Sequence, residues 1–165
     1  MTLPSCALSL ILSLIFVALA PDLYRGKVTN EPDEAGKLMM AMRIDEAEKD
    51  LRAAAGYLAI QDSTTSEKIG ACVVFYGGHP KVKPDLPNLH APMLGLYADR
   101  DDFVTPDSVR ELERKLKELG KDVQVKIYPD ADHAFFNDAR PEVYNAGAAA
   151  DAWQRTVEFL RKNLR

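Results

Sequence analysis

The feature that most constrains this chain is a regular alternation between short apolar runs and amphipathic helical segments. Residues 71–76, 93–98 and 123–128 read as strands, and residues 106–119 and 141–164 follow the second and third runs with helical spacing. Alternation of this kind is typical of an α/β fold, an open parallel sheet with helices on both faces. In such a sheet the chemistry lies in loops beyond the carboxyl ends of the strands.

The helix expected after residue 105 carries its own start and stop signals. Thr105 is a good N-cap residue, Pro106 suits the first helical turn, and Gly120 stands where a helix-ending glycine belongs. The predicted inner face consists of Val109, Leu112, Leu116 and Leu119, and the predicted i,i+4 ion pairs are Glu111–Lys115 and Glu113–Lys117. Helical patterns also cover residues 31–41 and 43–61.

The N-terminal part begins with an apolar run at residues 6–20, which allows two interpretations. At 15 residues the run is short for a helix that crosses a bilayer, and no basic residue precedes Arg25, as a signal peptide would require. Residues 18–20 resemble a cleavage site, but Pro21 follows them. A buried strand at residues 15–18 is the favoured interpretation. We therefore predict a hydrophobic N-terminal segment at residues 1–14 and one α/β domain at residues 15–165.

Composition excludes several classes of protein. The 165 residues suit one domain, and a net charge of −4 gives no electrostatic reason to expect nucleic acid or a membrane as partner. Two cysteines and three scattered histidines are too few for a disulfide scaffold or a metal cluster, and no glycine-rich phosphate loop is present. We expect no metal and no cofactor. We expect a cytoplasmic protein, or a secreted or membrane-associated one if residues 1–20 act as a signal.

Two loops carry the candidate catalytic residues. Asp101 lies just after the strand at residues 93–98, and His133 lies just after the strand at residues 123–128. An acid after one strand and a histidine after the next match the second and third members of an α/β-hydrolase triad. In that arrangement the histidine acts as general base while the carboxylate holds its tautomer.

Four segments make the resemblance more specific. Residues 17–24 (VALAPDLY), 75–80 (FYGGHP), 95–106 (GLYADRDDFVTP) and 128–138 (YPDADHAFFND) resemble the dienelactone hydrolase family of α/β-hydrolases. The resemblance implies that Asp101 is the triad acid, that His133 is the triad base and that the substrate is a small-molecule ester or lactone. It implies neither a cofactor nor a nucleic-acid partner.

The nucleophile that the resemblance would supply is missing. The family places a cysteine, or a serine in relatives, on a sharp G-x-C-x-G turn, expected here between residues 61 and 71. About two dozen residues, one strand-plus-helix unit, are absent at that point, and the family's N-terminal strands are absent too. Cys72 is followed by a β-branched run that cannot make such a turn, so we interpret it as a core residue and predict no nucleophile.

These observations predict a truncated member of the family. We expect an ester or lactone hydrolase with impaired activity; the alternative is a non-catalytic remnant or splice form that acts, if at all, as a binding protein. Loss of a strand would also leave part of the sheet uncovered, so self-association through that surface is expected.

Overall fold

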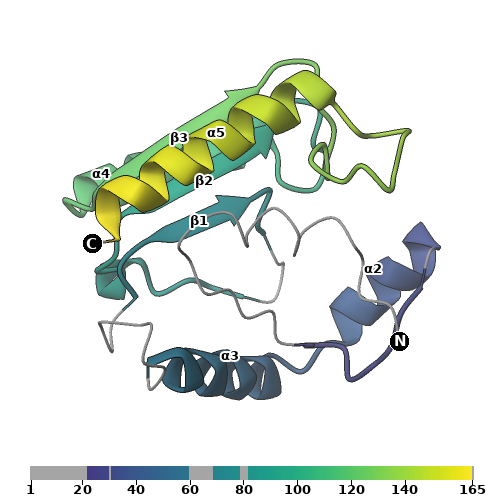
Figure 1. Cartoon of the computed structure of the whole chain (residues 1–165), viewed down its shortest axis with the longest axis horizontal. Coiled ribbons are helices and arrows are strands. Elements are labelled where there is room, and N and C mark those ends of the chain that lie inside the picture. Colours follow the sequence, from purple (N-terminus) through teal and green to yellow (C-terminus); the bar gives the residue numbers. More distant parts are fainter. Residues whose placement is uncertain (1–21, 30, 60–68, 79–81, 165) are drawn as a thin grey trace. The chain divides into compact units, whose positions relative to one another are not determined.

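The computed structural model describes residues 22–29, 31–59, 69–78 and 82–164 (Figure 1). Two compact units divide between residues 68 and 69. We call them the N-terminal unit and the C-terminal unit and describe each by itself. The predicted strand at residues 15–18 and the predicted boundary between residues 14 and 15 lie outside the described residues, so both stay predictions.

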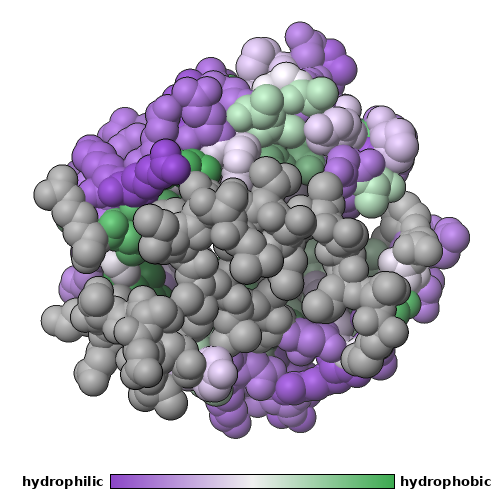
Figure 2. Space-filling view, viewed as in Figure 1, coloured by the Kyte–Doolittle hydropathy of each residue, from purple (hydrophilic) through white to green (hydrophobic). Residues whose placement is uncertain are grey.

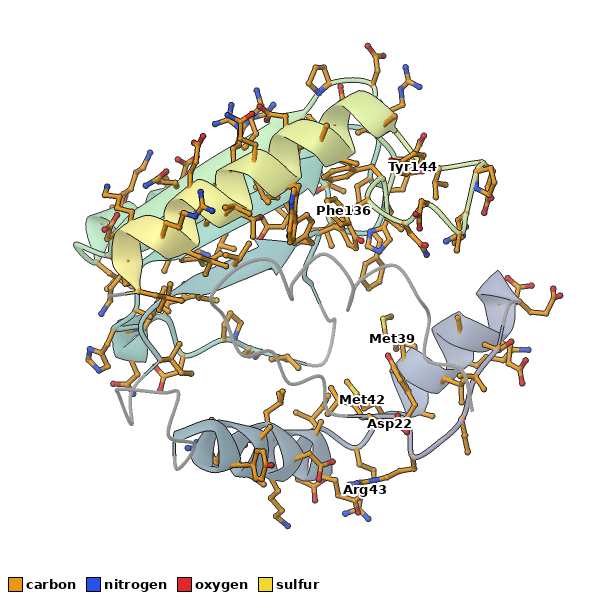
Figure 3. All side chains as sticks on the ribbon, in the orientation of Figure 1. Asp22, Met39, Met42, Arg43, Phe136 and Tyr144 are labelled. Carbon is orange, nitrogen blue, oxygen red and sulfur yellow. The ribbon has the colours of Figure 1, made fainter. Side chains whose placement is uncertain are left out.

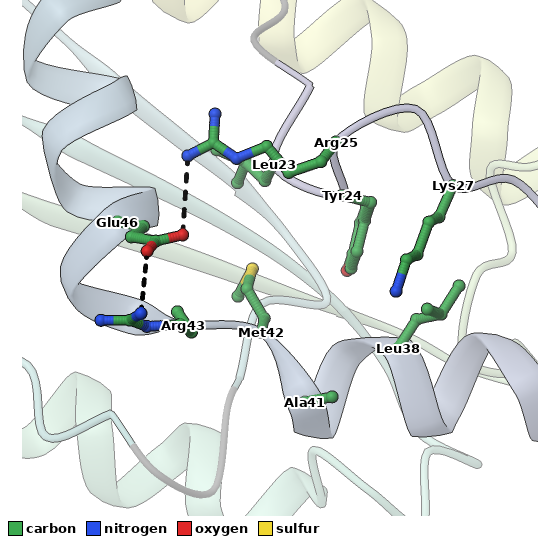
Figure 4. Close-up of a pocket in the computed structure, with 9 residues that line it drawn as sticks. All are labelled: Leu23, Tyr24, Arg25, Lys27, Leu38, Ala41, Met42, Arg43 and Glu46. Atoms are coloured by element: carbon green, nitrogen blue, oxygen red, sulfur yellow. Dashed lines mark ion pairs between the residues drawn. The ribbon is translucent and has the colours of Figure 1, made fainter.

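The N-terminal unit contains helices α2 (Pro32–Ala41) and α3 (Ile44–Ala59). Both helices agree with the sequence prediction to within two residues at each end. Arg25 and Arg43 both form ion pairs with Glu46, at 3.9 and 3.0 Å (Figure 4). These pairs border a pocket within this unit, which does not include Asp101 or His133; its lining residues are Leu23, Tyr24, Arg25, Lys27, Leu38, Ala41, Met42, Arg43 and Glu46.

The C-terminal unit is built on three parallel strands in the order β1-β2-β3. These are β1 (Cys72–Phe75), β2 (Met93–Ala98) and β3 (Val123–Tyr128), with a short 3-10 helix, η1 (Leu86–Asn88), between the first two. Cys72 pairs with Met93, and Met93 pairs with Val123, so the three strands start level with one another. Their carboxyl ends therefore share one edge of the sheet, as the sequence predicted.

Helix α4 (Pro106–Glu118) begins and ends as its capping signals indicate. The hydroxyl of Thr105 accepts a hydrogen bond from the Ser108 N–H at 3.3 Å, and Gly120 adopts the left-handed conformation with φ of 68°. Both predicted ion pairs form, Glu111–Lys115 at 3.3 Å and Glu113–Lys117 at 2.6 Å. The predicted inner face is wrong at one end, because Leu119 lies at the C-cap and is 45% exposed.

Helix α5 (Ala146–Asn163) starts five residues later than predicted. Residues 141–143 form a turn instead, in which the Tyr144 N–H donates to the Arg140 carbonyl at 3.0 Å. The helix begins after Asn145, whose side-chain oxygen accepts from the Ala148 N–H at 3.0 Å. Proline suits the first turn of a helix but forms no cap, whereas Asn145 satisfies an otherwise unpaired N–H group.

The two helices cover opposite faces of the sheet, because side chains alternate along β2. Leu94, Leu96 and Ala98 pack with residues of α5 that include Ala152 and Phe159. On the other face, two residues of α4 pack against β2: Leu116 contacts Met93, and Val109 contacts Tyr97. Figure 1 shows α5 crossing the sheet on the viewer's side, and Figure 2 shows hydrophilic side chains on its outer surface. The predicted open parallel sheet with helices on both faces is confirmed.

One edge of this sheet is open in the part of the chain that the structure describes. Strand β1 pairs with β2 on one side, and no described strand pairs with its other side. Self-association through an uncovered part of the sheet stays a prediction. Among the described residues, no helix is both long and apolar enough to cross a membrane.

Candidate active site

The loops that follow β2 and β3 are joined beyond the ends of the strands. The Asp99 N–H donates to the Tyr128 carbonyl at 3.1 Å, and the Arg100 N–H donates to the Ala131 carbonyl at 3.0 Å. The side chains of Arg100 and Asp130 add an ion pair between the two loops. This backbone ladder brings Asp101 and His133, which are 32 residues apart in sequence, to the same edge of the sheet.

Asp101 and His133 form a direct hydrogen bond, with 2.6 Å between Oδ2 and Nδ1. Asp101 is only 2% exposed, and its other oxygen, Oδ1, accepts from the N–H groups of Phe103 at 2.9 Å and Val104 at 2.8 Å. A buried carboxylate needs such partners, since burying it without them would be costly. The three bonds hold both oxygens of Asp101 in place.

This hydrogen bond also decides which nitrogen of His133 is reactive. An ionised carboxylate can only accept, so Nδ1 must carry a proton, and Nε2 of the neutral ring keeps its lone pair. Among the described residues, none forms a hydrogen bond with Nε2, and the His133 side chain is 44% exposed. The arrangement therefore holds a partly exposed imidazole in a fixed orientation, with the lone pair of Nε2 engaged by no described residue.

Two aromatic rings flank the imidazole. The Tyr76 ring lies 5.0 Å from the His133 ring, centroid to centroid, and the Phe103 ring lies 6.1 Å from it in an edge-on arrangement. Tyr76 follows β1 and Phe103 follows β2, so all three strands contribute to the site. Phe136, labelled in Figure 3, contacts the rings of Phe75 and Trp153 at 4.8 and 6.4 Å and so anchors the loop that carries His133.

Tyr76 adopts a conformation that is unusual for a residue other than glycine. Its φ is 38°, in the left-handed region, while its N–H donates to the Leu96 carbonyl at 2.8 Å. A Cβ atom added at Gly78 would lie 2.7 Å from Val104 Cγ2, so the chain leaves β1 through a tightly packed turn. Burial raises the pKa of the Tyr76 phenol. Such conformations persist where the surrounding structure holds them, and they are common at functional sites.

The sequence prediction paired Asp101 with His133 but assigned no role to Tyr76 or Phe103. Both residues lie inside the motifs FYGGHP and GLYADRDDFVTP, two of the segments that carry the resemblance to the family. The available signals were the aromatic residue before Gly77-Gly78 at a strand end and the aromatic residue two positions after Asp101. Neither signal specifies a contact with His133, because the contact depends on how three separate loops meet.

Cys72 lies at the opposite edge of the sheet from this site. It is the first residue of β1 and packs on the α4 face with Met93 and Leu116. Cys72 pairs with Met93, and Met93 pairs with Val123, the first residue of β3. The carboxyl end of β3 is five residues further along, so Cys72 lies roughly 16 Å below the edge that carries the site. Burial raises the pKa of its thiol. This position matches the interpretation of Cys72 as a core residue.

The remaining histidines do not join the site. His90 is exposed and precedes β2, at the amino edge of the sheet, and His79 lies outside the described residues. In the described ranges, no group of three or more His, Cys, Asp or Glu side chains could hold a metal ion.

Comparison with known proteins relates this geometry to a family. The model of the Dienelactone hydrolase family matches residues 9–72 and, in a second overlapping match, residues 54–164. A protein of Aquifex pyrophilus, named Protein usf, is 35% identical over 175 aligned positions that cover 90% of this chain and 76% of that protein. The chain belongs to the dienelactone hydrolase family.

Further relatives and solved structures agree with this assignment. A protein of Aquifex aeolicus with the provisional name carboxymethylenebutenolidase is 31% identical over 176 positions, covering 91% of this chain and 76% of the relative. The structure of a provisionally named dienelactone hydrolase from Klebsiella pneumoniae matches with a TM-score of 0.61 and 23% identity over 86% of this chain and 73% of its own. A structure named m3DLH matches with a TM-score of 0.71 and 17% identity over 88% and 74% of the two chains. The two structures show a shared fold.

The alignments also show how this family member differs in length. The alignment with the A. pyrophilus protein has 175 positions, but 90% of 165 residues is about 149, so about 26 positions of that relative face no residue here. The A. aeolicus alignment gives the same difference. The printed sequence contains neither Gly-x-Cys-x-Gly nor Gly-x-Ser-x-Gly, the turn that carries the nucleophile in this superfamily.

Proposed function

We propose that this chain is a dienelactone hydrolase-like ester or lactone hydrolase with impaired turnover, in which Asp101 and His133 remain as the acid–base pair. The observation that carries the proposal is the 2.6 Å hydrogen bond from His133 Nδ1 to the buried Asp101 carboxylate. It keeps the lone pair of Nε2 available on a partly exposed side chain at the carboxyl edge of a parallel sheet, where this fold class places its chemistry. The substrate in this proposal is a small-molecule ester or lactone, the class that the name of the A. aeolicus relative indicates.

In the proposed reaction, His133 activates water. Nε2 takes a proton from a water molecule while the oxygen of that water attacks the ester or lactone carbonyl carbon. Asp101 stays ionised and stabilises the imidazolium through the Nδ1–H bond. When the tetrahedral intermediate collapses, Nε2 returns the proton to the leaving alkoxide, and the carboxylic acid and alcohol separate.

The absent nucleophile turn explains why turnover should be low. Such a turn supplies both the covalent nucleophile and a backbone N–H for the developing oxyanion. Removing one oxyanion donor alone slows acyl transfer by about 10²–10³-fold. In a serine protease, loss of the nucleophile lowers kcat by about 10⁶-fold, and the rate that remains is about 10³–10⁴-fold above that of the uncatalysed reaction. We expect this chain to hydrolyse its substrate at about the lower of these two rates, roughly 10³-fold above the uncatalysed reaction.

Two findings support the place of the missing turn. About 26 positions of each Aquifex relative face no residue of this chain, a length that suits one strand and one helix. The two family matches overlap at residues 54–72, a range that runs from the last six residues of α3 to the first residue of β1, rather than forming one continuous match.

The test is hydrolysis of an activated ester by the purified full chain and by His133→Ala and Asp101→Asn. We expect slow turnover in the parent chain, loss of the protein-dependent rate in His133→Ala and a large reduction in Asp101→Asn. Circular dichroism of each variant separates lost activity from lost folding. Equal rates in all three chains would refute the proposal and favour the alternative, a non-catalytic remnant that acts by binding.

A further inference from the structure

We propose that His133 Nε2 is itself the covalent nucleophile when the substrate is an aryl ester, and that an acyl-imidazole forms at this residue. The inference rests on the proposed function, since both need a reactive His133, but it names a different bond-forming step and a narrower substrate class. In a complete triad the histidine serves only as base, because a serine or cysteine lies against it. Here the sequence offers no such residue on the required turn.

The chemistry of Nε2 carries the first part of the inference. The Asp101 carboxylate holds the proton on Nδ1 at 2.6 Å, so the lone pair of the neutral ring lies on Nε2. No described residue forms a hydrogen bond with Nε2, and the side chain is 44% exposed. Histidine is among the side chains that form covalent intermediates in enzymes. Nε2 therefore has the exposure and the orientation that attack on a carbonyl carbon requires.

The aromatic rings next to His133 indicate which class of ester would bind at the site. Tyr76 lies 5.0 Å from the imidazole with an angle of 56° between the rings, and Phe103 lies 6.1 Å from it at 84°. Phe103 is 49% exposed, while Tyr76 is half-buried and held in its left-handed conformation by the turn after β1. Aromatic groups prefer edge-to-face and offset contacts with other rings, and the rings of Tyr76 and Phe103 offer such contacts to a substrate bound beside His133. An aryl leaving group is the ester component that this pair of side chains fits best.

The leaving group also decides between the two reactions of His133. An aryloxide is stable enough to depart without being protonated, so direct attack by Nε2 can expel it. An alkoxide, including the one released when a lactone opens, needs the proton that the general-base route delivers. His133 therefore serves as nucleophile for aryl esters and as base for alkyl esters and lactones.

The steps balance with water as the only co-reactant. Nε2 attacks the carbonyl carbon and forms a C–N bond, and the C–O bond to the aryl group breaks as the aryloxide departs with the electron pair. The acyl-imidazolium keeps its Nδ1–H on Asp101. Water then adds to the acyl carbon, the C–N bond breaks with its electron pair returning to Nε2, and the carboxylic acid and one proton are released.

The chain contains a matched control. His90 is also exposed, but no described residue supplies a carboxylate bond or a ring contact to it, and it lies at the amino edge of the sheet. Acylation that depends on exposure alone would affect His90 as much as His133. Acylation that depends on the site would be confined to His133.

The experiment exposes the full chain, His133→Gln, His90→Gln and Asp101→Asn to p-nitrophenyl trimethylacetate, whose bulky acyl group slows release of the intermediate. We expect a transient acyl adduct mapped to His133 by mass spectrometry, discharged by hydroxylamine, in the parent chain and in His90→Gln. His133→Gln should lose both the adduct and the nitrophenolate release. Asp101→Asn should slow adduct formation by between about 10-fold and 10⁴-fold.

The solvent isotope effect separates this inference from the proposed function. Nucleophilic attack moves no proton in its rate-limiting step, so the nitrophenolate release of the first turnover, measured before the acyl group is hydrolysed, should change little in rate in D₂O, and this first-turnover release is the one compared. If release depends on His133 but slows markedly in D₂O and no adduct forms, His133 acts only as base: the inference is overturned and the proposed function stands. If His133→Gln releases nitrophenolate as fast as the parent chain, both are overturned.

Discussion

Replacing Asp101 tests whether one buried carboxylate both builds the loop after β2 and orients His133. Its Oδ1 accepts from the N–H groups of Phe103 and Val104, and its Oδ2 accepts from His133. Asp101→Ala removes all three bonds. Val104 is 8% exposed, so its N–H would lose a partner in a place that water reaches poorly.

The expected cost follows from these contacts. A buried N–H left unpaired costs about 1–3 kcal/mol, and a hydrogen bond to a charged group contributes about 1.5–3 kcal/mol. Relief of the carboxylate's own desolvation offsets part of this loss. We expect Asp101→Ala to lower the free energy of unfolding by about 2–4 kcal/mol. Asp101→Asn keeps a neutral oxygen that accepts from the two N–H groups and gains an amide N–H that can donate to Nδ1 of the other His133 tautomer, so we expect a smaller loss of about 1 kcal/mol.

The assay is urea unfolding followed by the fluorescence of Trp153, the single tryptophan, which lies in α5 of the same unit. Asp102→Ala is the matched control, because Asp102 is exposed and should change stability by no more than about 0.5 kcal/mol. If Asp101→Asn is as destabilising as Asp101→Ala, the Oδ1 contacts do not stabilise the loop. If Asp101→Ala equals the Asp102 control, none of the three bonds contributes a net stabilisation.

Four further predictions address the core, the pH response and the chain terminus. Burial raises the pKa of Tyr97 to about 12 in the folded state, against about 10 in the unfolded state, so the unfolded state loses its proton first as pH rises. About 2–3 kcal/mol of stability that is present below pH 10 should be lost by pH 12, and Tyr97→Phe should reduce that loss in unfolding curves measured across this range. Leu116→Ala should lower the unfolding free energy by about 2–5 kcal/mol in the same urea assay, whereas Leu119→Ala, at an exposed position, should change it by no more than about 0.5 kcal/mol. Cys72→Ser should leave ester hydrolysis unchanged, and a matching loss of rate would contradict its placement at the amino edge of the sheet. N-terminal sequencing of the protein purified from its native host should find residues 6–20 if that apolar run is a buried strand, and a chain that begins near residue 21 would indicate a cleaved signal.

Local rules were sufficient for the best-predicted elements. Strands β2 and β3 have the predicted bounds, and α4 starts directly after Thr105 and ends before Gly120 because capping depends on groups within one turn of the chain. The predicted start of the last helix at residue 141 was wrong because the side chain of Asn145 caps the N-terminus of α5, and Pro141 supplies no such acceptor.

The sequence by itself determined the type and order of the elements in the C-terminal unit and the edge at which Asp101 and His133 would meet. Periodicity specifies which face of an element is apolar, and the parallel order of strands specifies which loops share an edge. The tertiary structure decided what the two residues can do there. The 2.6 Å bond, the open Nε2 and the rings of Tyr76 and Phe103 arise from three loops packed against one another. Contacts of that kind depend on distances between segments far apart in the chain, and no local pattern encodes those distances.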